Sequence, residues 1–352
     1  MTRVQAVPIP AFTRPRHCFD DVPEELMMRI RQRVPQIDKT AKQIVAWKEQ
    51  ELQELFGVEM LIGSELKFTS PVACCGSQKQ YEHEICERFH ESIYLAGLYP
   101  VHHDTTRTCQ VATKPEPPSQ AINTLFQLKD YLIHRALLEG DLTQTSFINP
   151  FGENKYHPHM HLNFSLSING NNVFVNGRND HLVTDLTENM LEDLQGAFVV
   201  FILGQDSLKR YPFNNPNSPR TFTYNSSLAD KDDGHSILLR YHYVKEKARA
   251  ELRVAESSGI DSLQILFIVG STLNTLDELI KCYEHDVDKT RLLDSLEECL
   301  RTRPVNLRGQ PLIRPTIELY KTREEAFKKF VELEAKMKQI FGNEIYEMIT
   351  KD

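Results

Sequence analysis

The chain has 352 residues, of which 40% are hydrophobic and 26% are charged, and its formal net charge is -8 at pH 7. These proportions are typical of a globular protein with one large domain or two. The negative charge argues against general binding to nucleic acid, and the sequence contains no apolar run of about 18 residues that would predict a membrane span. We find no signal-peptide pattern, and seven cysteines without a CxxC pair favour reduced thiols, so the expected location is cytoplasmic.

The first third of the chain predicts mostly helices. Residues 1–21 read as an extended arm, and two helices are expected to follow: one from Pro23 to about Arg33, and one capped by Asp38 that ends at Gly57. A strand is expected at 60–69 because polar and apolar residues alternate there. Further along we expect a helix at 78–99, a strand pair within 101–113, a helix that starts at Ser119 and ends at Gly140, and a strand at 146–149.

The rest of the chain predicts a mixture of strands and long helices. After a central strand that ends near Gly170, we expect a helix capped by Thr187 and running to about Leu208. Strands are expected near 219–225, 235–244 and 248–254, followed by a helix at 261–285. From Asp286 we expect helices separated by the loop RTRPVNLRGQPLIRP, the last and longest of them at 323–349. Strands interrupted by long helices predict an α+β fold.

The central strand, HPHMHLNFSLSING at 157–170, has an unusual polar side. His157, His159 and His161 alternate with apolar residues, so the three imidazoles share one face, as ligands of a divalent metal would. The alternative is that one of them is a ligand or a core histidine and the others lie at a wet edge. The closing Asn169-Gly170 pair predicts a tight hairpin.

Three strands carry charged or imidazole side chains at positions i and i+2. The pairs are Glu65/Lys67, His159/His161 and Glu251/Arg253. If these strands are neighbours in one sheet, two carboxylates and one imidazole converge on one face. Such an oxygen-rich set suits Mg²⁺ or Mn²⁺ better than structural Zn²⁺.

Three arginines near these strands could bind phosphate oxygens. Taken singly, Arg210, Arg240 and Arg253 are more typical of surface arginines. Together with a metal site, they suggest chemistry on a nucleoside triphosphate.

Several motifs, taken in order, resemble those of the catalytic domain of the glutamine synthetase and glutamate–cysteine ligase superfamily. They are GSELKF, VHHDTTRTCQVAT, the central strand with its hairpin, DSLKRYPFNNPNSP, TYNSS and ARAELRVAE. The resemblance runs from about Gly57 to about Ile280. It implies a curved, mostly antiparallel sheet flanked by long helices. The domains expected from it are an amino-terminal arm with helices at 1–56, a catalytic core at 57–285 and a helical segment at 286–352 packed on the core.

The resemblance also implies roles for individual residues. It places Glu65, His161 and Glu251 at one metal, Asp104 and Gln110 at a second metal, Asn163 and Ser165 near the nucleotide, Arg210 near the substrate carboxylate, and Arg240 and Arg253 near the transferred phosphate. Lys67 stands where the family has a second carboxylate, Gln110 replaces another, and Asp104 is a shorter substitute. A second metal is therefore doubtful. Within residues 1–56 we expect no equivalent of the small β-grasp domain of glutamine synthetases.

The function implied by the resemblance is ATP-dependent ligation of a carboxylate to an amine, with Mg²⁺ or Mn²⁺ as the metal. The expected partners are small-molecule carboxylate and amine substrates, without nucleic acid or membrane, and the expected assembly is a monomer or a small homo-oligomer. Two alternatives stay open. One is a degenerate member of the fold that acts as a binding or regulatory module, and the other is a phosphotransferase similar to guanidino kinases.

Overall fold

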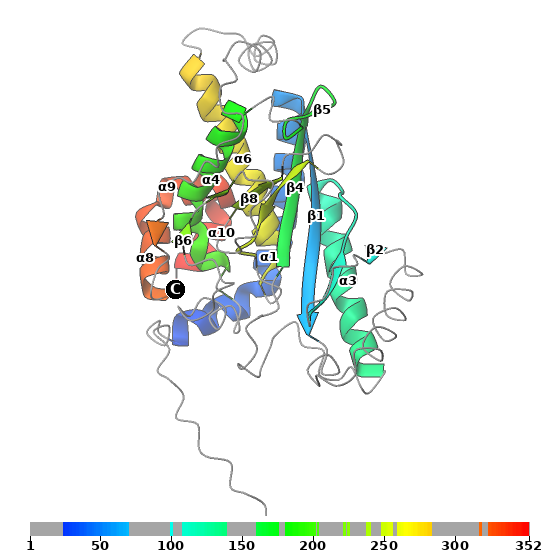
Figure 1. Ribbon diagram of the computed structural model, residues 1–352. Helices are drawn as coiled ribbons and strands as arrows, with labels where there is room; N and C mark the ends of the chain where they lie inside the picture. The colour runs from blue at the N-terminus through cyan, green and yellow to red at the C-terminus, as the bar shows by residue number, and fades with distance from the viewer. Residues whose placement is uncertain are drawn as a thin grey trace, which may run out of the picture.

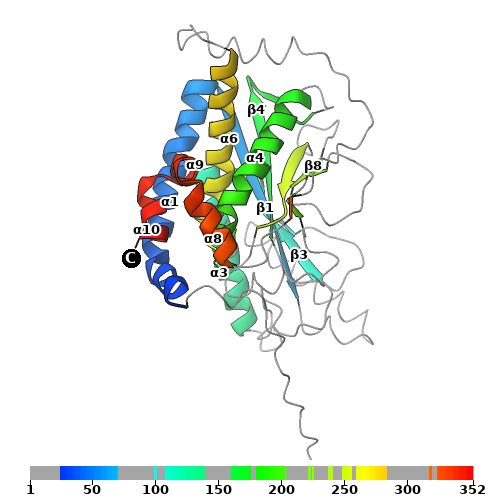
Figure 2. The ribbon, with the colours of Figure 1, turned by 90° about the vertical axis from the view of Figure 1, so that its left-hand side faces the viewer.

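The computed structural model describes residues 24–69, 99–100, 108–138, 160–175, 180–201, 203, 221–222, 224–225, 237–240, 248–255, 259–283, 317–318 and 323–351. Among these residues, long helices cover one face of an open sheet (Figure 1). Figure 2, in which the helical side of Figure 1 faces the viewer, shows α4 lying over β1 and β4. The predicted α+β fold is confirmed.

The main sheet is built around β1 and β4. Its strands follow the order β2 (Tyr99–Pro100), β3 (Thr108–Ala112), β1 (Val58–Thr69), β4 (Met160–Ile168), β9 (Arg249–Leu252), β8 (Ile237–Arg240) and β7 (Tyr224–Asn225), and β5 (Asn171–Asn172) pairs with β4. All of these pairs are antiparallel except β7 with β8. Strands β6 (Thr221–Phe222) and β10 (Ile317–Glu318) form a separate antiparallel pair. The strands that contain residues 65, 161 and 251 are therefore neighbours, as the sequence analysis required.

The hairpin between β4 and β5 has the predicted tight turn. Asn169 and Gly170 both have positive φ, at 48° and 75°, which is the backbone conformation that an Asn-Gly turn favours. Asn172 then fixes the end of the hairpin. Its Nδ2 donates to the carbonyl of Ala248 at 2.9 Å, and its Oδ1 accepts the N–H of Phe174 at 2.9 Å. One buried amide thus joins the hairpin to the segment that enters β9.

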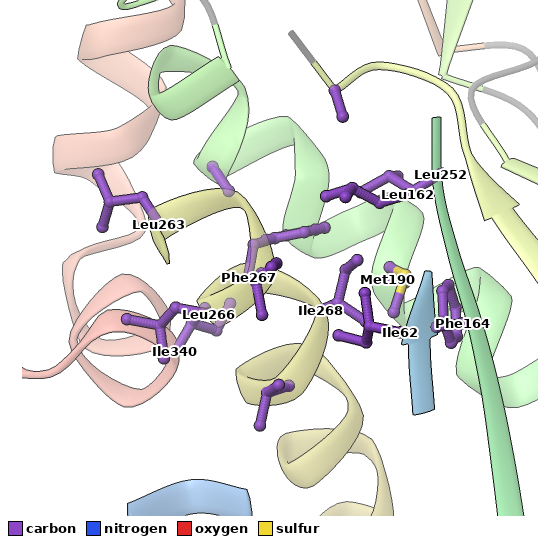
Figure 3. Packing of buried hydrophobic residues seen from close by; sticks show 14 of the residues in the cluster. Ile62, Leu162, Phe164, Met190, Leu252, Leu263, Leu266, Phe267, Ile268 and Ile340 are labelled. Atoms are coloured by element: carbon purple, nitrogen blue, oxygen red, sulfur yellow. The ribbon is translucent and has the colours of Figure 1, made fainter. Parts of the chain in front are cut away.

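The helices supply most of the core. They are α1 (Glu24–Phe56), α3 (Pro118–Leu138), α4 (Asp180–Phe201), α6 (Asp261–Tyr283), α8 (Arg323–Glu332), α9 (Glu334–Phe341) and α10 (Asn343–Thr350). Figure 3 shows Ile268 of α6 and Met190 of α4 beside Ile62 and Phe164 of the sheet. The apolar side of β1 and β4 is buried against these helices, which leaves the other side of the same strands for polar groups. No helix in the described ranges is both long and apolar enough to span a bilayer.

The expected break between two amino-terminal helices, after about Arg33 and before Asp38, proved wrong. Helix α1 is continuous, with Pro35 inside it. The buried residues Ile30, Ile37, Ala41 and Val45 recur at helical spacing across the proline. Proline removes one hydrogen-bond donor from the helix, but a continuous buried stripe on both sides outweighs that loss.

The expected starts of two other helices, at Ser119 and at Thr187, also proved wrong. Helix α3 begins at Pro118, so Ser119 lies in its first turn and donates its backbone N–H to Oε2 of Glu49 at 2.8 Å. A carboxylate from α1 therefore meets the positive end of α3. Thr187 lies inside α4, because buried Leu182, Val183 and Leu186 extend that helix toward its amino terminus.

The last helix was expected to be continuous but is divided into α8, α9 and α10. Gly342 separates α9 from α10 with φ 86°, a conformation that other residues rarely adopt. The break turns α10 so that Ile345 and Ile349 are buried as well as Ile340 and Phe341 of α9. The expected helix at 78–99 lies outside the described residues except for Tyr99, which belongs to strand β2. The expected elements at 146–149 and 286–316 also lie outside the described residues.

Buried ion pairs connect the helices to one another. Asp193 of α4 accepts a hydrogen bond from Ser271 of α6 at 2.6 Å and pairs with Lys336 of α9 at 2.6 Å. Burial raises the pKa of Asp193, and its two partners only partly oppose that effect. Asp261 at the start of α6 pairs with Lys129 of α3, and burial likewise raises its pKa. The helical layer is thus fixed by specific polar contacts in addition to apolar packing.

Candidate metal centre

The candidate site lies on the side of β4 that faces away from the helices' apolar core. Because side chains alternate along a strand, Leu162 and Phe164 enter the core while His161 and Asn163 point to the opposite side. The backbone register places Glu65 of β1 directly across from His161. It places Glu251 of β9 directly across from Asn163. Three adjacent strands therefore bring two carboxylates to one imidazole.

The three side chains come close enough to share one cation. One ligand atom each from Glu65, His161 and Glu251 lies within 4.8 Å of the other two. Oε2 of Glu65 is 3.5 Å from Nδ1 of His161. Ligand atoms of a single Mg²⁺ or Ca²⁺ are at most about 4–5 Å apart, because each lies about 2.0–2.6 Å from the ion. The cluster therefore has the dimensions of a divalent-metal site.

All three groups are buried. Glu65, His161 and Glu251 expose 9%, 3% and 1% of their surface. Two carboxylates in such a position need a cation nearby, because removing their charge from water is costly. Glu65 and Glu251 each add one negative charge and a neutral imidazole adds none, so the donor set fits a divalent ion with hard-ligand preference.

Asn163 and Arg249 complete the cluster. The Asn163 amide nitrogen donates to Oε1 of Glu65 at 3.1 Å, and its amide oxygen accepts from Nε of Arg249 at 3.2 Å. Nη2 of Arg249 is 3.2 Å from Oε1 of Glu65 and 3.3 Å from Oε1 of Glu251. One guanidinium nitrogen thus contacts both carboxylates.

The other predicted site residues fall into two groups. In the first group are residues that the structure describes. Arg253 is buried and follows β9 directly. Ser165 is partly buried and lies four residues from His161, which is about 13 Å along the strand. The backbone of Lys67 pairs with Gln110 of β3, and that of Arg240 pairs with Arg249. Asp104, Arg210, His157 and His159 lie outside the described residues. The roles expected for these residues remain predictions.

Arg249 is the residue to which the sequence analysis gave no role. The sequence did indicate that Arg249 could lie near Glu251, because it precedes Glu251 by two positions and so shares that residue's side of the strand. Arg253, two positions after Glu251, carries the same signal. Alternation alone could not tell which arginine would contact the carboxylates.

Two solved structures share this arrangement of sheet and helices. A cryo-EM structure of Plasmodium falciparum glutamine synthetase matches with a TM-score of 0.60, covering 88% of this chain and 74% of that chain at 12% identity. The chain has the glutamine synthetase fold. A crystal structure of a novel glutamine synthase homolog also matches with a TM-score of 0.60, over 88% of this chain and 70% of that chain at 14% identity.

The glutamine synthetase fold confirms the resemblance drawn from the motifs. No sequence-family model matches the chain, and no curated protein is similar enough in sequence to match it. Identities of 12% and 14% establish the fold and leave the activity to be argued from the site.

Proposed function

We propose that this protein is an ATP- and divalent-metal-dependent ligase that joins a carboxylate to an amine. The observation that supports the proposal most directly is the buried cluster of Glu65, His161 and Glu251 on three adjacent strands of a glutamine synthetase fold. In the proposed reaction, the γ-phosphoryl group of ATP is transferred to a carboxylate oxygen and ADP is released. The amine then attacks the acyl carbon and displaces phosphate.

The residues of the cluster would hold Mg²⁺ or Mn²⁺. Such a cation neutralises negative charge on phosphate oxygens, which is a large part of catalysis in phosphoryl transfer. Glu65 and Glu251 supply two anionic oxygens, and His161 supplies a nitrogen. The Asn163 amide, 3.1 Å from Glu65, orients that carboxylate so that its remaining oxygen stays directed toward His161.

Arg253, which follows β9 directly, would act on the anionic parts of the substrates. Arg253 exposes only 7% of its surface, so it is ordered by its surroundings and desolvated. A guanidinium in that state interacts strongly with phosphate or carboxylate oxygens, because little water screens the charge. These properties support a role for Arg253 near the transferred phosphoryl group.

A second candidate function has its own supporting observation. Nη2 of Arg249 is 3.2 Å and 3.3 Å from the two carboxylates, so one positive charge of the chain itself offsets part of their negative charge. A protein of this kind could keep the fold without binding metal or ATP, and could serve as a binding or regulatory module.

Binding experiments distinguish the two functions. We expect the melting temperature of the purified protein to rise when ATP and Mn²⁺ are added together, and this rise to disappear in Glu65→Gln and Glu251→Gln. Both substitutions keep the size of the side chain and remove its charge. Glu59→Gln is the matched control, because Glu59 is an exposed residue of the same strand β1. The absence of any metal-dependent effect of ATP on the wild type would contradict the ligase proposal and support the binding module.

An activity measurement then tests the reaction itself. Pools of amino acids, other small carboxylates and amines are added with ATP and Mg²⁺, and ADP release and new products are followed by mass spectrometry. A product whose mass corresponds to an amide, lost in Glu251→Gln, is the expected result. A phosphorylated acid or guanidine without an amide would support the phosphotransferase alternative instead.

A further inference from the structure

Arg249 lies in an unusual position relative to the candidate metal ligands. Its Nη2 is 3.2 Å from Glu65 and 3.3 Å from Glu251. Its Nε donates to Oδ1 of Asn163 at 3.2 Å. The guanidinium is therefore directed to the same carboxylates that would bind the cation, and it is already fixed there by three contacts.

Because the Glu65 and Glu251 carboxylates are buried, they need a positive charge beside them both with and without a bound metal. The Glu65 and Glu251 side chains are 11% and 2% exposed, whereas Arg249 is 30% exposed. Two buried carboxylates on neighbouring strands repel each other and lose hydration. When no metal is bound, the more exposed guanidinium of Arg249 offsets both the repulsion between the carboxylates and their loss of hydration.

A divalent ion bound to these oxygens would be close to that guanidinium. A divalent ion lies about 2.1 Å from each oxygen that it binds. If that oxygen belongs to Glu65 or Glu251 and also contacts Nη2 of Arg249, the ion and the guanidinium are about 5 Å apart, and little water screens their repulsion. The carboxylates cannot satisfy both cations fully. The flexible and partly exposed Arg249 side chain is the partner that can move, while Asn163 keeps its own bond to Glu65.

We propose that Arg249 is a built-in counter-cation that occupies the carboxylates before metal binds and must leave them when metal enters. The inference rests on the metal-binding role proposed above for Glu65, His161 and Glu251. It has two consequences. The protein folds stably without metal, and its affinity for metal is weakened by competition with its own arginine.

The test compares metal affinity in wild type and in Arg249→Gln, measured by Mn²⁺ titration followed by electron paramagnetic resonance. We expect Arg249→Gln to bind Mn²⁺ at least tenfold more tightly and, without metal, to melt at a lower temperature that Mn²⁺ restores. Arg249→Lys, which keeps the charge, should stay close to wild type. The matched control is Arg33→Gln, because Arg33 of α1 donates to the carbonyls of Met348 and Lys351 at the carboxyl end of the chain, and neither belongs to the cluster.

The outcomes separate this inference from the proposed function. If wild type binds Mn²⁺ and Arg249→Gln binds it no more tightly, the competition is refuted while the metal site stands. If only Arg249→Gln binds Mn²⁺, Arg249 is a permanent occupant that does not leave the carboxylates, which overturns the inference as stated and favours the binding module. If neither protein binds Mn²⁺, the metal site and the inference are both refuted.

A second measurement does not depend on the folding of a variant. In wild-type protein labelled with ¹⁵N-arginine, the Arg249 Nε signal, assigned by its absence in Arg249→Lys, should shift on titration with diamagnetic Mg²⁺. An Nε signal that stays unchanged at saturating Mg²⁺ would show that the guanidinium remains in place and would overturn the proposal.

Discussion

The contact between α6 and α9 gives a stability prediction that follows from a single atom. Replacing Gly270 by alanine would place Cβ 2.6 Å from the backbone oxygen of Ile340 and 3.1 Å from its Cα. Ordinary contacts begin at 3.4 Å, so the two helices would have to separate by about 0.8 Å at this point. The obstacle is backbone, and a change of rotamer cannot relieve it.

The expected free-energy change follows from two opposing effects. Alanine stabilises a helix by about 1 kcal/mol relative to glycine, whereas overpacking of a core costs about 1–3 kcal/mol. Because backbone is displaced, we take the upper end of that range and expect Gly270→Ala to lower the free energy of unfolding by about 2 kcal/mol.

Gly196→Ala is the matched comparison for this substitution. Its new Cβ would meet Met337 Cε at 2.7 Å, and the end of a methionine side chain can move aside. We therefore expect its stability to stay within about 1 kcal/mol of wild type. Urea unfolding followed by circular dichroism measures both variants. A Gly270→Ala protein as stable as Gly196→Ala would refute the close packing of α6 on α9.

Two further predictions concern buried polar groups. Asn172→Ala leaves the Ala248 carbonyl and the Phe174 N–H without the bonds that Asn172 supplies, and should lower the free energy of unfolding by about 2–4 kcal/mol in urea; a loss below about 0.5 kcal/mol would contradict the role of this amide. Burial lowers the pKa of Lys48, which donates to the Gln339 carbonyl at 2.9 Å. The unfolded chain therefore holds this proton at pH values where the folded chain has released it, so stability rises with pH between the lowered pKa and the ordinary value of about 10.4. The stability of Lys48→Met relative to wild type should accordingly fall as pH increases toward 10, and a constant difference would contradict the prediction.

The convergence of the candidate ligands could be predicted from the sequence because strand geometry is simple. Residues two apart share a side, so His161 and Glu251, each between two apolar neighbours, and Glu65, which precedes Leu66, have only one direction available. The hairpin at Asn169-Gly170 was predictable for a similar reason, since few residue pairs adopt its positive φ angles. The side that each residue faces and the hairpin turn depend on local sequence, whereas the convergence also required β1, β4 and β9 to be neighbours, which they are.

Helix boundaries were less predictable because tertiary packing decides them. Pro35 reads as a break, yet the buried stripe on either side keeps α1 continuous. Thr187 reads as a cap, yet the residues before it are buried, and its hydroxyl instead donates to the carbonyl of Val183 at 2.5 Å within α4. In each case the local signal was real but weaker than the burial of an apolar face.

The role of Arg249 needed the structure because it depends on side-chain direction. Arg249 and Arg253 flank Glu251 symmetrically in the sequence. Only the coordinates show that Arg249 contacts Glu65 across β4, a strand that separates β9 from β1. Its Nε also contacts Asn163 on β4 itself. A contact between side chains of non-adjacent strands cannot be inferred from alternation within one strand.

The position of bound metal is the most direct test of the account. Crystals soaked with Mn²⁺ and measured at a wavelength that gives anomalous scattering from manganese should show a peak bounded by Glu65, His161 and Glu251, with the Arg249 guanidinium moved away from both carboxylates. A peak elsewhere, or none at Mn²⁺ concentrations that saturate the protein in solution, would contradict the assignment of these three residues as a metal centre.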